Sequence, residues 1–466
     1  MALADDMTGG EVMATEQYYR SPEGAFWWVN RRKEWIGRPA ADFRLKLKAA
    51  GHCTTVLEGE KMSELEREFL TVSAENGVDY AGVIAGWKPG YSERDGTRYL
   101  ISREIPPMPP AEPTDYESIF KNWPNLSRLL LGMFNGTDDF DPTMKVRQIE
   151  SFLGWWRQSY ICLRTNDIRN GLALVLAGDA GCGKTLLKEF IRLSFGGRES
   201  QPYRWFTGQE QFNGNLMASP LWTIDDEQAD TSYKARNSFG AKLKLCVANA
   251  GIPVRGMHRD ELTFYPFRRI VVCVNREPER LMVLPPLVSD MVDKMLILKC
   301  YNNPLTARLR NKTGAEKAIF FNKVVEELPH FLHWLTNVWE VPKALVGRFG
   351  VPHFCHYEIE RELFTLSPNQ RLWDLIRRYI ESRSIDGMKP IWFGGAKMLQ
   401  NGMTSESSPL SDKDKKMIPA WNWLGHRLKQ LAKQYPDAFS FKRARDYNEW
   451  TIDITNYIDK EWKDAE

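Results

Sequence analysis

The residues with the clearest chemical potential form the glycine-rich stretch GDAGCGKT, residues 178–185. It matches the pattern G-x-x-x-x-G-K-[ST] at every defined position, after an apolar strand pattern and before an amphipathic helical one. Glycines allow backbone N–H groups to close around phosphate oxygens, and the start of the following helix directs a positive dipole toward the same anion. This context favours a phosphate-binding loop over a chance strand–helix turn.

Two residues of this loop have defined roles toward a nucleoside triphosphate. Lys184 would reach the β- and γ-phosphates, and the Thr185 hydroxyl would ligate Mg²⁺. ATP and Mg²⁺ are therefore the predicted cofactors. The residues expected to bind the nucleotide are Gly178, Asp179, Ala180, Gly181, Cys182, Gly183, Lys184, Thr185 and Leu186.

Carboxylates end the next strong strand pattern, LWTIDDE at residues 221–227. Carboxylates at the carboxyl edge of a strand can hold Mg²⁺ and polarise an attacking water. An acidic cap on a solvent-facing turn is the simpler alternative, but the position about forty residues after the phosphate loop favours the catalytic interpretation. Asp225 and Asp226 are the expected working pair, and Glu227 is the reserve candidate.

A third polar residue, Asn275, ends the apolar strand pattern RRIVVCVN. Its amide can hydrogen-bond the γ-phosphate or the lytic water and so report hydrolysis to neighbouring strands. Asparagine is common after strands, so Asn275 alone is a weak signal. It becomes informative because it is the third element in the order phosphate loop, acidic strand, asparagine strand. That order is the layout of AAA+-type ATPases, and the sequence has no NKxD motif of the kind by which small GTPases recognise guanine.

A basic tip, RGMHRD at residues 255–260, lies between two extended patterns upstream of Asn275. One interpretation is a solvated hairpin turn. The other is a loop that projects His258 and Arg259, together with Arg255, into the channel of a ring to hold DNA phosphates.

Together these segments resemble superfamily 3 helicases, in particular the primase–helicase group of phages, plasmids and poxviruses. The phrases GDAGCGKT, LWTIDDE and PFRRIVVCVNREPE carry the resemblance, which is specific over residues 165–300. It implies a ring, usually a hexamer, that hydrolyses ATP and draws single-stranded DNA through its pore. It also implies Mg²⁺ ligation by Thr185, Asp225 and Asp226, sensor 1 at Asn275, and DNA contacts from the hairpin tip.

The resemblance implies an arginine finger from a neighbouring subunit, soon after sensor 1. The phrase DMVDKMLIL offers Lys294, whereas Arg280 and Arg276 lie closer to sensor 1. Because lysine does not spread transition-state charge as arginine does, Lys294 and Arg280 both stand as candidates. Residues 16–113 carry no D-x-D dyad on a strand, which argues against a built-in primase activity.

Apolar strands and intervening helices must position these residues. The runs LALVLAG, LWTIDDE, RRIVVCVN and KMLILKC, separated by helical patterns, indicate a parallel sheet covered by helices on both faces. The predicted fold class is α/β. It comprises a P-loop ATPase core of AAA+ and superfamily 3 type, an α+β N-terminal domain and a C-terminal winged-helix-like module.

The proline-rich stretch PPMPPAEP at residues 106–113 sets the first domain boundary, since proline cannot continue a helix interior. Residues 314–345 are predicted as helix, and two helical patterns followed by a strand pair predict the C-terminal module. The expected segments are a disordered tail at 1–15, an α+β accessory domain at 16–113, a helical oligomerisation collar at 114–167, the ATPase at 168–345 and the winged-helix-like domain at 358–466.

The C-terminal module is locally basic. Residues 411–450 carry nine Lys and Arg against five Asp and Glu, with Lys442, Arg443 and Arg445 along the predicted wing. That charge suits duplex or forked DNA, and docking to another protein is the alternative. The 17 tryptophans do not by themselves indicate base stacking, because most lie at helical or strand spacing with other apolar residues, which favours core packing.

Composition excludes several classes. With a net charge of +3, any basic surface must be local. The seven cysteines form no CxxC pair, which argues against a zinc ribbon and fits reduced thiols. The acidic N-terminus lacks the apolar core of a signal peptide, and no apolar run is long enough to cross a bilayer. We expect a cytoplasmic protein, in a bacterium or a virus-infected cell, without membrane partners.

The function expected from the sequence is an ATP-dependent DNA helicase or translocase of viral, phage or mobile-element replication. It would act on single-stranded or forked DNA as a homo-hexameric ring, with a separate primase or polymerase as a further candidate partner. Two alternatives stay open. One is a P-loop ATPase that does not unwind, such as a loader or a nucleotide switch in defence or transposition. The other is a DNA-binding replication initiator with weak ATPase activity.

Overall fold

The computed structural model describes residues 17–112, 119–134, 140–141, 146–225, 230, 232–255, 261–286, 289–347, 350–365, 368–384, 389–445 and 447–457. The chain divides into two compact units. Unit 1 comprises Met1–Arg276 with Asp290–His356, and unit 2 comprises Glu277–Ser289 with Tyr357–Glu466. The tail predicted at residues 1–15 lies outside the described residues.

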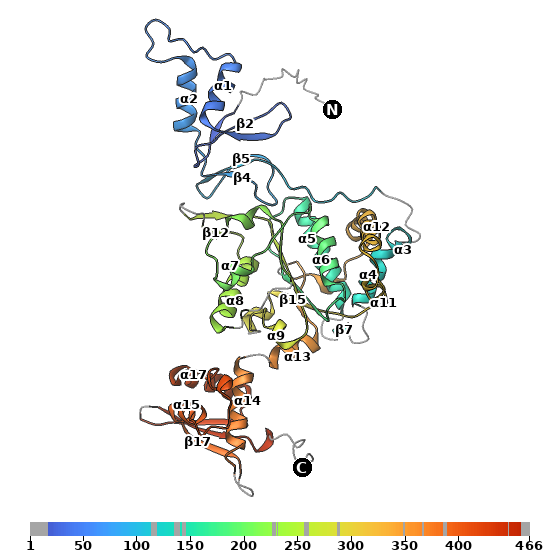
Figure 1. The fold of residues 1–466 in the computed structure, drawn as a ribbon, viewed down its shortest axis with the longest axis vertical. Coiled ribbons are helices and arrows are strands. Elements are labelled where there is room, and N and C mark those ends of the chain that lie inside the picture. The colour runs from blue at the N-terminus through green and yellow to red at the C-terminus, as the bar shows by residue number, and fades with distance from the viewer. Residues whose placement is uncertain are drawn as a thin grey trace, which may run out of the picture. The chain divides into compact units, whose positions relative to one another are not determined.

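Unit 1 is built on a six-stranded parallel sheet in the order β10-β11-β14-β9-β15-β16 (Figure 1). All residues of β9, β14 and β15 are buried, which explains their uninterrupted apolar runs. The α/β core with a parallel sheet, predicted from those runs, is confirmed. The strands are β9 (Ala173–Gly178), β10 (Glu199–Ser200), β11 (Leu221–Asp225), β14 (Arg269–Val274), β15 (Met295–Cys300) and β16 (Phe354–Cys355).

Aromatic side chains join the helices of unit 1 to the sheet and to one another. Phe190 of α6 stacks on Phe321 of α12, and the fully buried Trp156 of α5 meets Phe331 of α12. Figure 1 shows α4, α5, α6 and α12 gathered together, and α7 beside α8. The helices are α3 (Ile119–Asn122), α4 (Pro124–Phe134), α5 (Gln148–Arg164), α6 (Lys184–Ser194), α7 (Tyr203–Thr207), α8 (Tyr233–Ala248), α10 (Ser289–Val292), α11 (Pro304–Arg310) and α12 (Gly314–His333).

The helix predicted over residues 314–345 is shorter in the structure. Regular α-helix ends at His333, and Trp334–Val338 continues as a π-helical turn. A separate 3₁₀ turn follows at Lys343–Leu345. The backbone becomes extended at Trp339, which ends the helical stretch, and Pro342, immediately before the 3₁₀ turn, has no N–H with which to continue a helix.

Two small sheets form the N-terminal part of unit 1. Strands β1, β2 and β3 pack on helices α1 and α2, with Phe26, Phe43 and Leu47 in their core. Strands β4, β6 and β5 form the second sheet, and a turn at Asp95–Gly96 joins β5 to β6. The elements are β1 (Tyr19–Arg20), β2 (Phe26–Val29), β3 (Trp35–Arg38), α1 (Ala40–Ala49), α2 (Glu64–Glu75), β4 (Tyr80–Gly82), β5 (Gly90–Arg94) and β6 (Thr97–Ile101). A short hairpin of β7 (Phe140–Asp141) and β8 (Val146–Arg147) precedes α5.

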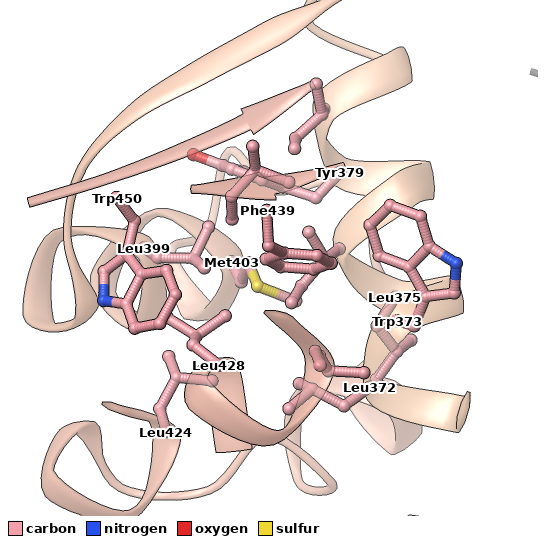
Figure 2. Packing of buried hydrophobic residues seen from close by; sticks show 14 of the residues in the cluster. Leu372, Trp373, Leu375, Tyr379, Leu399, Met403, Leu424, Leu428, Phe439 and Trp450 are labelled. Atoms are coloured by element: carbon pink, nitrogen blue, oxygen red, sulfur yellow. The ribbon is translucent and has the colours of Figure 1, made fainter. Parts of the chain in front are cut away.

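Unit 2 has its own hydrophobic core, shown in Figure 2. Trp373 of α14 lies at its centre, with ring contacts to Phe439 and Tyr435. An antiparallel sheet in the order β17-β19-β18 packs on the helices. The elements are α9 (Pro278–Leu281), α13 (Tyr357–Thr365), α14 (Pro368–Glu381), β17 (Ile391–Gly395), α15 (Ala396–Thr404), α16 (Asp412–Lys415), α17 (Trp421–Gln434), β18 (Phe439–Arg443) and β19 (Asn448–Asp453).

The sequence interpretation of this unit identified α14, α17 and the β18–β19 pair but not β17 and α15. Strand β17 reads IWFGG, and its two glycines carry no side chain to pack in a strand. Its pairing with β19 forms it. Across the described residues of the whole chain, none of the helices combines the length and the apolar composition that a bilayer crossing requires.

Candidate functional site

The glycine-rich loop joins the end of β9 to the start of α6. Gly181 and Gly183 have φ values of +75° and +109°, a backbone region that residues with a Cβ rarely adopt. A Cβ on Gly178 would lie 2.4 Å from the carbonyl oxygen of Cys300 on the neighbouring strand β15. Glycine is therefore required at all three positions, by conformation at two of them and by close approach at the third.

Lys184 is buried and connects this loop to the end of β14. Its Nζ donates to the carbonyl oxygens of Gly178 and Asp179, at 2.8 and 2.9 Å, and to Oδ1 of Asn275 at 2.9 Å. The two strands are hydrogen-bonded neighbours. The structure thus brings the predicted lysine and the predicted third-strand asparagine into direct contact, although 91 residues separate them.

Asp225, the last residue of β11, lies beside Thr185. The Thr185 hydroxyl donates to Oδ1 of Asp225 at 3.2 Å. A hydroxyl and a carboxylate side by side form the kind of oxygen pair that Mg²⁺ prefers, so these residues fit the predicted metal. Asp226 and Glu227 lie outside the described residues.

Lys188, one helical turn after Lys184, was not singled out from the sequence. Its Nζ is 3.5 Å from Oδ2 of Asp225, 2.9 Å from Glu189 and 3.6 Å from Glu199. Burial opposes the charged form, but the three surrounding carboxylates outweigh burial and raise the pKa of Lys188. A permanent cation therefore sits next to the carboxylate expected to help hold Mg²⁺.

A second contact that the sequence did not reveal holds the outer side of the loop. Arg310, at the end of α11, donates from Nη2 to the carbonyl oxygen of Ala180 at 2.8 Å and from Nε to that of Gly181 at 3.3 Å. Asn302 accepts from the same guanidinium and donates to Oδ2 of Asp179 at 2.8 Å. The segment that follows β15 thus binds three consecutive loop residues.

The loop also contains a buried thiol, Cys182. A hydrogen bond from Cys300 lowers the pKa of Cys182 to about 7; burial opposes this shift, and Lys184 adds to it. The pKa of Cys300 is correspondingly raised, chiefly by burial. Cys182 therefore titrates near neutral pH, in the loop that would surround phosphate oxygens.

The predicted hairpin exists as an antiparallel pair, β12 (Ile252–Val254) and β13 (Leu262–Phe264). The buried Asn213 holds β12 and the first residue of the tip, accepting from the backbone N of Arg255 and donating to the carbonyl oxygen of Pro253, both at 3.0 Å. The Arg255 side chain is exposed. His258 and Arg259 lie outside the described residues.

The sheet β4-β6-β5 braces this hairpin. The Tyr99 hydroxyl donates to the carbonyl oxygen of Thr263, and Trp87 Nε1 donates to that of Tyr265 at 2.7 Å. The Arg94 guanidinium lies 3.7 Å from the centre of the Tyr265 ring. The N-terminal region is thus in direct contact with the element expected to meet DNA.

Two buried arginines fasten the chain near the start of β14: Arg268 lies just before the strand and Arg269 is its first residue. Arg268 donates to the carbonyl oxygens of Cys246 at 2.9 Å, Ala250 at 3.1 Å and Asn249. Arg269 donates to the Ser159 hydroxyl at 2.8 Å. Burial lowers the pKa of Arg269 to about 10, which still leaves it charged at neutral pH. These contacts fix the connection from the hairpin to Asn275.

The two candidate trans residues, Lys294 and Arg280, belong to different units. The backbone oxygen of Lys294 accepts from Ala173, the first residue of β9, so Lys294 lies at the opposite end of the strand from the glycine-rich loop. Its Nζ pairs with Asp293. A residue that acts on a neighbouring subunit need not lie near its own loop. Arg280 is an exposed residue of α9 in unit 2.

The three predicted DNA-contacting residues of the C-terminal module are exposed. Lys442 and Arg443 belong to β18, and Arg445 lies in the turn that leads to β19. Register pairs Lys442 with Glu449 and Arg443 with Asn448. Because cross-strand partners share a face and neighbours alternate, Lys442 and Arg443 lie on opposite faces of the sheet.

No protein-family model and no curated protein matches the sequence. Among solved structures, the A form apo structure of the NrS-1 C-terminal region aligns over 94% of this chain and 96% of its own, with a TM-score of 0.50 and 12% identity. A second apo structure of that region aligns over 94% and 95%, with a TM-score of 0.50 and 14% identity. The chain shares this fold.

A further match is titled "SCCmec type IV Cch - active helicase". It covers 94% of this chain and 93% of its own, with a TM-score of 0.41 and 10% identity. At these identities the likeness concerns the fold alone. The fold shared with the two NrS-1 structures is what these comparisons establish for this chain.

Proposed function

We propose that this protein hydrolyses ATP and uses the energy to move along DNA. The observation that carries the proposal is the meeting of three strand ends at one edge of the sheet. Lys184 follows β9 and contacts Asn275 after β14, while Thr185 contacts Asp225 at the end of β11. A lysine hydrogen-bonded to an amide, beside a hydroxyl hydrogen-bonded to a carboxylate, supplies the groups that phosphoryl transfer from ATP requires.

In this proposal, backbone N–H groups of residues 178–185 bind the phosphates and Lys184 neutralises charge on the β- and γ-phosphates. Thr185 and Asp225, with Asp226, would hold Mg²⁺, which when bound neutralises developing charge on the phosphate oxygens. Asn275 would orient the attacking water or the γ-phosphate. Since Asn275 now accepts from Lys184, a γ-phosphate that draws the lysine away would free the amide for this role.

The same geometry supports a route from hydrolysis to DNA. Asn275 directly follows β14, Arg268 and Arg269 anchor the start of β14, and the hairpin strand β13 ends only five residues before β14 begins. A change at Asn275 would therefore reach the hairpin through a short, fastened segment. His258, Arg259 and Arg255 are the proposed DNA contacts of the hairpin.

For the whole chain we propose the organisation expected from the sequence. Residues 16–113 would form an accessory domain, 114–167 a collar, 168–345 the motor and 358–466 a winged-helix module. The order α14, β17, α15, α17, β18, β19, with β19 between β17 and β18, supports the last assignment. The motor would work as a homo-hexameric ring on single-stranded or forked DNA, with Lys294 or Arg280 as the trans residue.

The experiment that tests this proposal measures ATP turnover with and without single-stranded DNA. We expect DNA to raise turnover several-fold and the His258→Ala, Arg259→Ala double variant to lose that stimulation while keeping basal turnover. A strand-displacement assay with Asn275→Ala as the inactive control then tests unwinding. ATPase activity that ignores DNA would favour a loader or switch. Near-zero hydrolysis with intact DNA binding would favour an initiator.

A further inference from the structure

Unit 2 contains a pocket of about 690 Å³. It is lined by the start of α15, one face of α17 and the first residues of β19 with the turn before them. Its volume falls within the range of about 300–1,000 Å³ that is usual for ligand sites, large enough for one nucleotide. None of its described lining residues is a proposed motor residue.

Aromatic side chains line the pocket. Trp421 and Tyr447 both line it with more than half of their surface exposed, 55% and 56%. Trp450, only 1% exposed, lines it from the edge of the hydrophobic core, where Figure 2 shows it beside Leu399. Large aromatic surfaces left in water at the mouth of a concave site are available for stacking against a flat ligand.

The ionisable side chains that are described in the lining are all basic. Lys397, His426 and Lys429 line the pocket, and among its described lining residues there is no Asp or Glu. Glu449, between two lining residues of β19, points to the opposite face by strand alternation. Arg443, the cross-strand partner of Asn448, lies on the same face as the pocket. The pocket therefore complements an anion.

An occupant must combine flat aromatic groups with negative charge, which is the chemistry of a nucleotide chain. In a duplex each base is covered by its neighbours and its partner, so its face cannot reach Trp421. We propose that the pocket binds an unpaired base of single-stranded DNA, stacked on Trp421 or Tyr447, with flanking phosphates at Lys397 and Lys429. This inference deepens the proposed function and rests on it for the choice of DNA.

The test uses the full chain carrying Lys184→Ala, His258→Ala and Arg259→Ala, without ATP, so that neither turnover nor the hairpin contributes. Fluorescence anisotropy measures binding of a short fluorescent single-stranded oligonucleotide. We expect Trp421→Ala to weaken binding about 5- to 100-fold and Lys429→Ala to weaken it less, and more so at low salt. Duplex affinity should change by less than twofold in both variants.

Matched controls come from the same helix. Trp423 is 64% exposed and Lys433 is exposed, but neither lines the pocket. Trp423→Ala and Lys433→Ala should therefore leave single-strand binding near its starting value. As a direct readout, an oligonucleotide carrying 5-iodouracil should photocrosslink to Trp421 or Tyr447, as identified by mass spectrometry.

Equal effects of Trp421→Ala and Trp423→Ala, or equal losses for single-stranded and duplex DNA, would overturn the inference, as would crosslinks confined to unit 1. Unchanged binding of both DNA forms would instead assign the pocket to a protein or to no ligand. If wild-type ATPase activity ignores DNA but the crosslinks map to the pocket, the proposed motor function fails and the pocket assignment stands.

Discussion

The phosphate loop of unit 1 and the pocket of unit 2 are built in opposite ways. The loop is a contiguous stretch of eight residues, and its polar groups bond to one another and to strand ends. The pocket draws on three separate segments and leaves its largest aromatic groups exposed. A site that surrounds phosphate with backbone N–H groups needs a contiguous stretch of residues, so it appears in the sequence as a motif. A site that stacks on a flat ligand can be assembled from side chains of separate segments, so it leaves no motif.

The substitution Lys184→Ala should have the largest effect, and it should affect the phosphate loop without affecting the pocket. Removing the side-chain amine that bonds both to the loop carbonyls and to Asn275 should lower ATP turnover by at least about 100-fold, measured as phosphate release. Oligonucleotide crosslinking to the pocket should persist. Lys317→Ala, an exposed lysine of α12, is the control and should hydrolyse ATP normally. Loss of pocket crosslinking in Lys184→Ala would break the comparison.

The second test weakens the hydrophobic core of unit 2 by one substitution and changes no residue of unit 1. Trp373 is 1% exposed and contacts three aromatic rings, so Trp373→Ala should cost about 3–5 kcal/mol of the free energy of unfolding of unit 2. Urea unfolding followed by circular dichroism would report it as an earlier transition. Basal ATP turnover should stay within twofold, and a parallel fall in turnover would show that the two units do not act separately.

A smaller effect is expected from Arg310→Ala. The change leaves the carbonyl oxygens of Ala180 and Gly181 without the guanidinium donor, so the loop loses part of its fixed shape. We expect the KM for ATP to rise about tenfold, equivalent to about 1.4 kcal/mol, with a smaller change in kcat. Arg308→Ala, an exposed arginine of the same helix, should leave both constants unchanged.

The smallest expected effect is a dependence of the KM for ATP on pH. Cys182 has a pKa of about 7 because Cys300 hydrogen-bonds its thiolate and Lys184 lies nearby; Asp179 opposes this. The thiolate therefore forms as pH rises from 6 to 8, and its charge repels the phosphates. The KM for ATP should increase about fivefold or less over that range. Cys182→Ala should flatten the profile, and an identical slope in both proteins would remove the thiol as the cause.

The sequence predicted those parts of unit 1 that a pattern of neighbouring residues marks. Four of the six strands of the large sheet were recognised as apolar runs, and the meeting of Lys184, Asp225 and Asn275 followed from parallel strands that end at one edge. Lys188 was missed because a lysine in an amphipathic helix is usually solvent-exposed; here three carboxylates gather around it. No local pattern marks such a contact.

Arg310 and the pocket were missed for a related reason. Arg310 lies 130 residues after Ala180, and only the turn from β15 into α11 brings it to the loop. Trp421 and Tyr447 looked like two more apolar residues among many. Strand β17, formed by pairing despite its glycines, was also invisible, yet Gly395 and the residues after it make one wall of the pocket. Tertiary pairing, not local preference, created each of these features.

The fastening of residues 265–268 by Arg268 has a mechanical consequence. A pull on strand β13 would reach α8 as well as β14, because the Arg268 guanidinium ties the connector to three carbonyl oxygens at the end of α8 and just beyond it. The connector therefore has little freedom to move separately from α8. The end of α8 would then move together with the connector, so α8 would take part in any coupling between the hairpin and Asn275.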